Sequence, residues 1–216
     1  MTITAAADGS ALGNPGPAGW AWYIDDDRWA AGGWPHGTNN MGELKAVLEL
    51  FRATAGVDDD LLVLCDSQYV INSVVKWMPG WKRKGWRKAD GSPVMNVELM
   101  KDIDAALQGR RYRFEWVKGH VGHELNEAAD DRARAAATAY QRGAEPDAGP
   151  GFGGAPAAAP PVAAAAAPAL FEAEAPPLKQ VVVGFSTAEL RALTNRAKRA
   201  GTTPEQLLRS LALEER

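Results

Sequence analysis

The sequence predicts an α/β domain, followed by a linker and a small C-terminal module. Three strand-like segments follow one another at the N-terminus, which favours antiparallel pairing. Helical and strand patterns then alternate as far as residue 143. From 144 to 177 the chain is dominated by Ala, Pro and Gly, a composition that cannot bury a core. We therefore predict a folded domain over 1–143, a flexible linker over 144–177 and a separate module over 178–216.

The composition is that of an ordinary globular protein. Of the 216 residues, 46% are hydrophobic and 24% are charged. The single cysteine, Cys65, excludes an internal disulfide and fits a reducing compartment. We find no N-terminal signal and no long apolar segment, so we expect a cytoplasmic protein without membrane contact. Although the net charge is -3, the chain contains a local basic patch, because residues 76–88 contain six bases and no acid.

The first segment is a run of small and β-branched residues that ends in Asp-Gly. It predicts a buried strand with Asp8 at the point where the chain turns. Asp8 is thus a candidate metal ligand, although an Asp in a turn is commonly structural. Residues 19–24 and 28–34 predict two further strands, which a tight hairpin of three consecutive Asp residues joins.

A helix is expected over 41–51, preceded by the polar capping residues Thr38, Asn39 and Asn40. Glu43 falls in its first predicted turn, where a glutamate commonly interacts with the helix dipole. The apolar run 61–65 predicts a strand that ends at Asp66, and a helix over 68–75 follows. Because sites in open α/β sheets collect at the carboxyl ends of strands, Asp66 is also a candidate.

Residues 76–88 interleave three tryptophans with the six bases. This pattern fits either a solvated face or a surface that follows a nucleic-acid backbone. A helix over 94–107 and a strand over 111–117 come next. A Gly-rich loop with His120 then leads to a helix that begins near Asn126 and carries Asp130 in an early turn.

Four carboxylates stand at the ends or starts of separate predicted elements: Asp8, Glu43, Asp66 and Asp130. Hard oxygen ligands without a Cys or His cluster favour Mg²⁺ or Mn²⁺ over zinc. Two such ions about 4 Å apart can hold the attacking water and the leaving oxygen of a phosphodiester. Neither Cys65 nor Ser67 has a base at the spacing of a catalytic nucleophile, so the pattern favours metal-dependent hydrolysis.

These motifs resemble type I ribonuclease H in order and spacing, over residues 1 to about 143. The resemblance implies a ribonuclease H-like, five-stranded mixed sheet flanked by helices. It also implies an endonuclease that hydrolyses the RNA strand of RNA/DNA hybrids and leaves 5′-phosphate and 3′-hydroxyl ends. The motifs are Asp8-Gly9-Ser10 with Gly13-Asn14-Pro15-Gly16, Thr38-Asn39-Asn40 with Glu43, Asp66-Ser67-Gln68-Tyr69, and Trp116-Val117-Lys118-Gly119-His120 with Asn126-Glu127 and Asp130.

The same resemblance assigns roles to residues. The four carboxylates would hold two Mg²⁺ ions, for which Mn²⁺ can substitute, and His120 would be the catalytic histidine of a loop. RNA would be distinguished from DNA by its 2′-OH groups. The substrate-binding residues would be Asn14, Thr38, Asn39, Asn40, Gln68, Trp77, Trp81, Lys82, Arg83, Lys84, Asn96 and Asn126.

Residues 178–216 resemble a ribbon-helix-helix module, with a ribbon over 181–185 and helices over 187–200 and 204–215. In that family the ribbon pairs in a dimer and contacts DNA. The apolar ribbon here leaves homodimerisation and contact with DNA or another protein as alternatives. Two competing functions for the whole chain are a binding module with a degenerate site and a regulator that acts through this module. The complete set of carboxylates favours the enzyme, because mutually repelling acids are costly without a metal.

Overall fold

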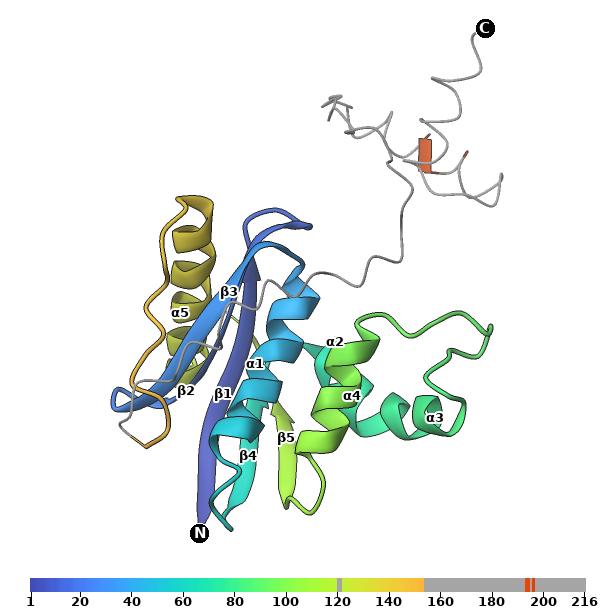
Figure 1. Cartoon of the computed structure of the whole chain (residues 1–216), viewed down its shortest axis with the longest axis horizontal. Helices are drawn as coiled ribbons and strands as arrows, with labels where there is room; N and C mark the ends of the chain where they lie inside the picture. Colours follow the sequence, from blue (N-terminus) through green and yellow to red (C-terminus); the bar gives the residue numbers. More distant parts are fainter. Residues whose placement is uncertain (120–121, 154–192, 195, 197–216) are drawn as a thin grey trace, which may run out of the picture. The chain divides into compact units, whose positions relative to one another are not determined.

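Five strands form one mixed sheet in the order β3-β2-β1-β4-β5 (Figure 1). The computed structural model describes residues 1–119, 122–153, 193, 194 and 196. The strand β1 pairs antiparallel with β2, which pairs antiparallel with β3, whereas β1, β4 and β5 run parallel. This arrangement confirms the predicted five-stranded mixed sheet. The strands are β1 Thr2–Ala11, β2 Gly16–Asp25, β3 Arg28–Gly37, β4 Asp60–Cys65 and β5 Tyr112–Trp116.

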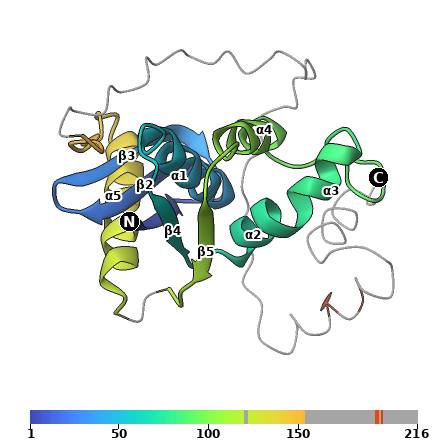
Figure 2. The same cartoon turned by 90° about the horizontal axis from the view of Figure 1, so that it is seen from below.

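Helices cover both faces of the sheet (Figures 1 and 2). The helix α1 contacts β1, β2 and α4 on one face, while α5 packs on β1, β2 and β3 from the other. Alanines on β1 allow this close packing, because Ala5 and Ala7 face the α1 side and Ala6 faces α5. The helical segments are α1 Asn39–Ala53, α2 Gln68–Ile71, the π-helical η1 Asn72–Trp77, α3 Met78–Arg83, α4 Val97–Ala106 and α5 Glu124–Gln141.

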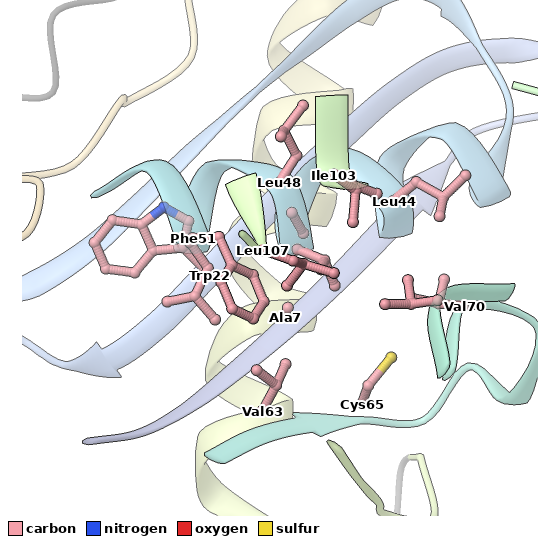
Figure 3. Packing of buried hydrophobic residues seen from close by; sticks show 14 of the residues in the cluster. Ala7, Trp22, Leu44, Leu48, Phe51, Val63, Cys65, Val70, Ile103 and Leu107 are labelled. Atoms are coloured by element: carbon pink, nitrogen blue, oxygen red, sulfur yellow. The ribbon is translucent and has the colours of Figure 1, made fainter. Parts of the chain in front are cut away.

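The main core lies between the sheet and the pair α1 and α4 (Figure 3). Phe51 and Leu48 of α1 and Ile103 of α4 meet Val63 and Cys65 of β4 there. All five side chains are almost completely buried. Burying large apolar side chains contributes about 1.5–3 kcal/mol each, so this layer anchors α1 and β4, the elements that carry Glu43 and precede Asp66.

Asp8 does not stand at a turn, so the expectation that β1 ends there is wrong. The strand continues to Ala11, and Asp8 pairs with Ala21 of β2. Gly9 is required for close packing of the backbone and not for a turn. A β-carbon at Gly9 would lie 2.5 Å from the carbonyl carbon of Gly42 and 2.9 Å from its α-carbon. Glycine at position 9 therefore permits the start of α1 to cross directly over β1.

The basic segment is more helical than its sequence pattern indicates. We predicted a helix over 68–75, but α2, η1 and α3 follow one another without a break as far as Arg83. Pro79 does not interrupt them, although proline often ends a helix, and it lies in the first turn of α3 directly after the π-helical η1. Trp77 and Trp81 therefore project from helical backbone.

The first residues of the predicted linker lie against β3. The backbone N–H of Ala31 donates to the carbonyl of Ala148 at 3.2 Å, and that of Gly151 donates to the carbonyl of Trp29 at 3.0 Å. Phe152 packs half-buried against the main core. The predicted boundary at residue 143 therefore precedes a segment, 148–152, that covers the edge strand of the sheet.

The predictions for His120 and for most of the C-terminal module fall outside the described residues. Within 178–216 the structure describes only residues 193, 194 and 196, which are helical. The ribbon-helix-helix module and its dimer stay predictions. Among the described residues, no helix is long and apolar enough to span a membrane.

Candidate metal centre and nucleic-acid interface

Three carboxylates converge at one end of the sheet. Asp8, Glu43 and Asp66 each offer an oxygen, and these oxygens lie within 4.8 Å of one another. The pairing of β1 with β4 ends at Ala6 and Leu64, so Asp8 on β1 and Asp66 directly after β4 both lie just past this ladder. Glu43 comes from α1, which Gly9 allows to approach. Three distant parts of the sequence thus supply one cluster.

The cluster is buried and electrostatically unfavourable on its own. Asp8 is only 5% exposed. Burial raises the pKa of Asp8 to about 8, to which the charge of Asp66 adds, whereas the Gly9 N–H, 2.7 Å from Oδ1, opposes the rise. Burial likewise raises the pKa of Glu43 to about 7. Buried, mutually repelling carboxylates with oxygen donors are typical of a divalent-metal site, because a cation offsets both penalties.

Two polar side chains fix the orientation of Glu43. The amide of Asn39 donates to Oε1 at 2.8 Å, and the hydroxyl of Ser67 donates to Oε2 at 2.6 Å. Sequence reasoning considered Ser67 only as a nucleophile and missed this role. It also placed Glu43 in the first helical turn, but α1 begins at Asn39 and has no acid there. The glutamate therefore points into the site rather than serving as a helix cap.

Asp130 approaches the cluster from the opposite face of the sheet. It lies on α5, which begins at Glu124 and so places Asp130 in its second turn. Its charge contributes to the raised pKa of Asp8, and its carboxylate forms an ion pair with Arg134 at 3.1 Å. Among the described residues, Asp130 is not one of the three carboxylates whose oxygens lie within 4.8 Å. Asn126, one turn earlier, is 2% exposed.

The loop that leads to His120 passes directly over Asp66. A β-carbon at Gly119 would overlap with Oδ2 of Asp66, so a larger residue at this position would displace the Asp66 carboxylate. The indole N–H of Trp116, just before the loop, donates to the backbone carbonyl of Asp66 at 2.9 Å. Trp116 belongs to one of the sequence motifs, but no pattern in the sequence indicates this bond.

An aromatic groove lies beside helices α2 and α3. The ring of Trp77 is 6.4 Å from that of Tyr69 and 5.7 Å from that of Trp81, measured between centroids. These three rings line a groove of about 470 Å³, together with Lys88, Val94 and Met95. Trp77 is 42% exposed. Exposed aromatic rings of this kind offer surfaces on which nucleotides stack.

The bases that follow the groove differ in their surroundings. Arg83 and Lys84 are exposed, whereas Lys82 forms an ion pair with Asp104 of α4 at 2.7 Å. Asn96, at the start of α4, has a left-handed backbone with φ of 54°. Because of its ion pair with Asp104, Lys82 also connects α3 to α4, a role that the charge pattern did not reveal.

The remaining predicted substrate-binding residues surround the start of α1 and of α2. Thr38 caps α1, since its hydroxyl accepts from the N–H of Met41 at 3.3 Å. Asn14 accepts from the N–H of Asn39 at 3.2 Å, which joins the β1–β2 loop to α1. Asn40 is half-buried, and Gln68 is exposed at the first position of α2.

Comparison with known proteins agrees with this geometry. The family model for RNase H matches residues 1–138. Ribonuclease H from Tropheryma whipplei (strain Twist) is 52% identical over 150 residues, which cover 69% of this chain and 93% of that protein. Ribonuclease HI from Streptomyces coelicolor is 46% identical over 144 residues, covering 63% of this chain and 62% of that protein.

A solved structure gives the same answer. LC9-RNase H1, a type 1 RNase H with the type 2 active-site motif, is 30% identical and superposes with a TM-score of 0.56. The match covers 65% of this chain and 74% of that one. Residues 1–138, which the family model matches, include all five strands and the three clustered carboxylates. The chain therefore belongs to the ribonuclease H family.

Proposed function

We propose that the chain is an endonuclease that hydrolyses the RNA strand of RNA/DNA hybrids and leaves 5′-phosphate and 3′-hydroxyl ends. The observation that carries this proposal is the convergence of Asp8, Glu43 and Asp66, whose oxygens lie within 4.8 Å. Membership of the ribonuclease H family supports the choice of substrate.

The carboxylates are proposed to hold two divalent ions, Mg²⁺ or Mn²⁺, with Asp130 as the fourth ligand residue. The donor set fits such ions because it consists of carboxylate oxygens without thiols, from the buried Asp8 and Glu43 and the half-buried Asp66. When bound, the ions would activate water and stabilise the charge that develops on the phosphate. Asn39 and Ser67 hold Glu43 in one orientation, so this ligand needs little rearrangement on binding.

Surrounding residues are proposed to select and orient the hybrid. Asn14 and Gln68 would contact RNA 2′-OH groups, and Thr38 and Asn96 would hold a phosphate of the DNA strand. Trp77 and Trp81 would stack against the hybrid, while Lys82, Arg83 and Lys84 would attract its backbone. His120 would assist proton transfer or product departure.

Cleavage of a labelled hybrid by the purified full chain tests the proposal. We expect cleavage of the RNA strand with Mg²⁺, none in excess EDTA, and none of duplex DNA. Asp66→Asn should abolish cleavage, because it removes a ligand charge while changing little volume. Asp131→Asn is the matched control, since Asp131 is an exposed neighbour of Asp130 on α5. Undiminished cleavage in EDTA, or wild-type turnover by Asp66→Asn, would rule out this mechanism.

A further inference from the structure

Trp116 occupies an unusual position for a tryptophan at the end of a strand. It is the last residue of β5 and is 49% exposed. Tyr112 and Phe114, earlier on the strand, pack against the main core. Trp116 is absent from the three core clusters of the described residues. Its indole N–H instead donates to the backbone carbonyl of Asp66 at 2.9 Å. Core packing therefore does not account for Trp116, and the polar contact becomes the feature to explain.

The carbonyl that accepts this bond lies just outside the sheet. Cys65 is the last residue of β4 and pairs with Trp116, and its carbonyl accepts from the N–H of Val117 at 3.1 Å. Asp66 follows, beyond the regular ladder. Without a partner its carbonyl would be free to turn, because strand-end residues lack the ladder bonds that fix the backbone. The indole N–H supplies a partner and so restrains the peptide between Asp66 and Ser67.

That peptide joins two groups of the carboxylate site. On one side is Asp66, whose carboxylate lies in the cluster with Asp8 and Glu43. On the other is Ser67, whose hydroxyl donates to Glu43 at 2.6 Å and also accepts from the N–H of Val70 at 3.4 Å. A rotation of this one peptide would displace the Asp66 carboxylate and loosen the hold on Glu43 at the same time.

We propose that Trp116 is a positioning residue, whose indole N–H orients the Asp66–Ser67 peptide and thereby places two of the clustered carboxylates. This inference rests on the proposed function, because it assigns Trp116 to the same site. It differs from a role in substrate binding, in which the exposed indole would stack on the hybrid. The two roles predict changes in different constants, a fall in kcat for positioning and a rise in KM for substrate binding.

The test replaces the N–H and keeps an aromatic ring. Trp116→Phe removes the donor, and substitution by β-(3-benzothienyl)alanine puts sulfur in place of Nε1–H while preserving the ring shape. Trp34→Phe is the matched control, since Trp34 is a half-buried indole on β3 that packs against the core. For each protein we would measure the Kd for Mg²⁺ by calorimetry without hybrid, then kcat and KM on the hybrid. Urea unfolding in EDTA checks that each variant is folded.

Positioning predicts that both Trp116 variants raise the Kd for Mg²⁺ by about threefold to tenfold, the equivalent of one lost hydrogen bond. It also predicts that kcat falls about tenfold, with KM changed by less than about twofold. The Trp34 variant should match the wild type. If Trp116→Phe does not fold, the benzothienyl variant decides by the same measurements.

Two results would overturn the inference. One is an unchanged Kd for Mg²⁺ with unchanged kcat, and the other is a rise in KM alone, which would assign Trp116 to substrate binding. The calorimetric readout also separates the two proposals of this site. If the wild type fails to cleave hybrids, the proposed function is wrong, while the comparison of Mg²⁺ affinities still decides the role of Trp116.

Discussion

Gly9→Ala tests how the carboxylate site is assembled. Gly9 lies next to Asp8, and a β-carbon there would meet three backbone atoms where α1 crosses β1. Two of them, the carbonyl carbon and the α-carbon of Gly42, would be 2.5 Å and 2.9 Å away, and the third is the nitrogen of Glu43. Backbone atoms cannot rotate away as side chains can. The helix must therefore move off the strand and carry Glu43 with it.

The size of the effect follows from those distances. Ordinary contacts of a β-carbon begin at 3.4 Å, so α1 and β1 would have to separate by about 1 Å. Overpacking of a close-packed interior costs about 1–3 kcal/mol, and a clash with backbone belongs at the upper end. Replacing glycine restricts the unfolded chain and offsets about 0.4–1 kcal/mol of that cost. We expect a net loss of about 2 kcal/mol in the free energy of unfolding.

Catalysis should suffer more than stability. A displacement of about 1 Å at a catalytic group can cost about 100-fold in rate, so we expect kcat to fall by that order. Urea unfolding measures the first effect and hybrid cleavage measures the second. Gly56→Ala is the matched control, because a β-carbon at Gly56 would have no neighbour within 4 Å. It should raise stability slightly and leave kcat unchanged. If Gly9→Ala is as stable and active as Gly56→Ala, the close crossing of α1 over β1 does not exist as described.

Three further predictions follow from burial and from the covered edge of the sheet. Asp8→Asn should stabilise the metal-free protein while abolishing cleavage, because the pKa of Asp8 is raised from 3.8 to about 8 and its ionisation opposes folding as pH rises through that interval. Thermal melting in EDTA should show that the gain in the free energy of unfolding is larger at pH 8 than at pH 5, by a difference on the order of 3 kcal/mol. An equal gain at both pH values would contradict this cause. A chain that ends at residue 143 should be less stable than one that ends at 153 by about 2 kcal/mol, because it lacks Phe152 and two backbone hydrogen bonds to β3. Equal midpoints for the two chains in urea unfolding would disprove this prediction. Cys65 is 1% exposed and burial raises the pKa of its thiol, so iodoacetamide should modify it only after unfolding; rapid labelling of the native protein, detected by mass spectrometry, would refute its burial.

Much of the fold could be predicted because it depends on local patterns. Alternating and helical spacings of apolar residues indicated all five strands and the helices α1, α4 and α5 near their observed positions. The boundaries were less accurate where packing decides them. The strand β1 continues past Asp8 because β2 pairs with it as far as Ala11. The helical segment from Gln68 continues to Arg83 through Pro79, a residue type that commonly ends a helix.

Residue type and order alone were enough to nominate Asp8, Glu43 and Asp66, since carboxylates at strand and helix ends are visible in any sequence. Their convergence within 4.8 Å was decided by the tertiary structure, which brings two parallel strands and a crossing helix together. The partners of the site were hidden for the same reason. The bonds from Ser67 to Glu43 and from Trp116 to Asp66 join residues 24 and 50 positions apart, and the cover of β3 by 148–152 joins segments further apart still. Such contacts depend on which surfaces meet in three dimensions, and no local spacing in the chain encodes them.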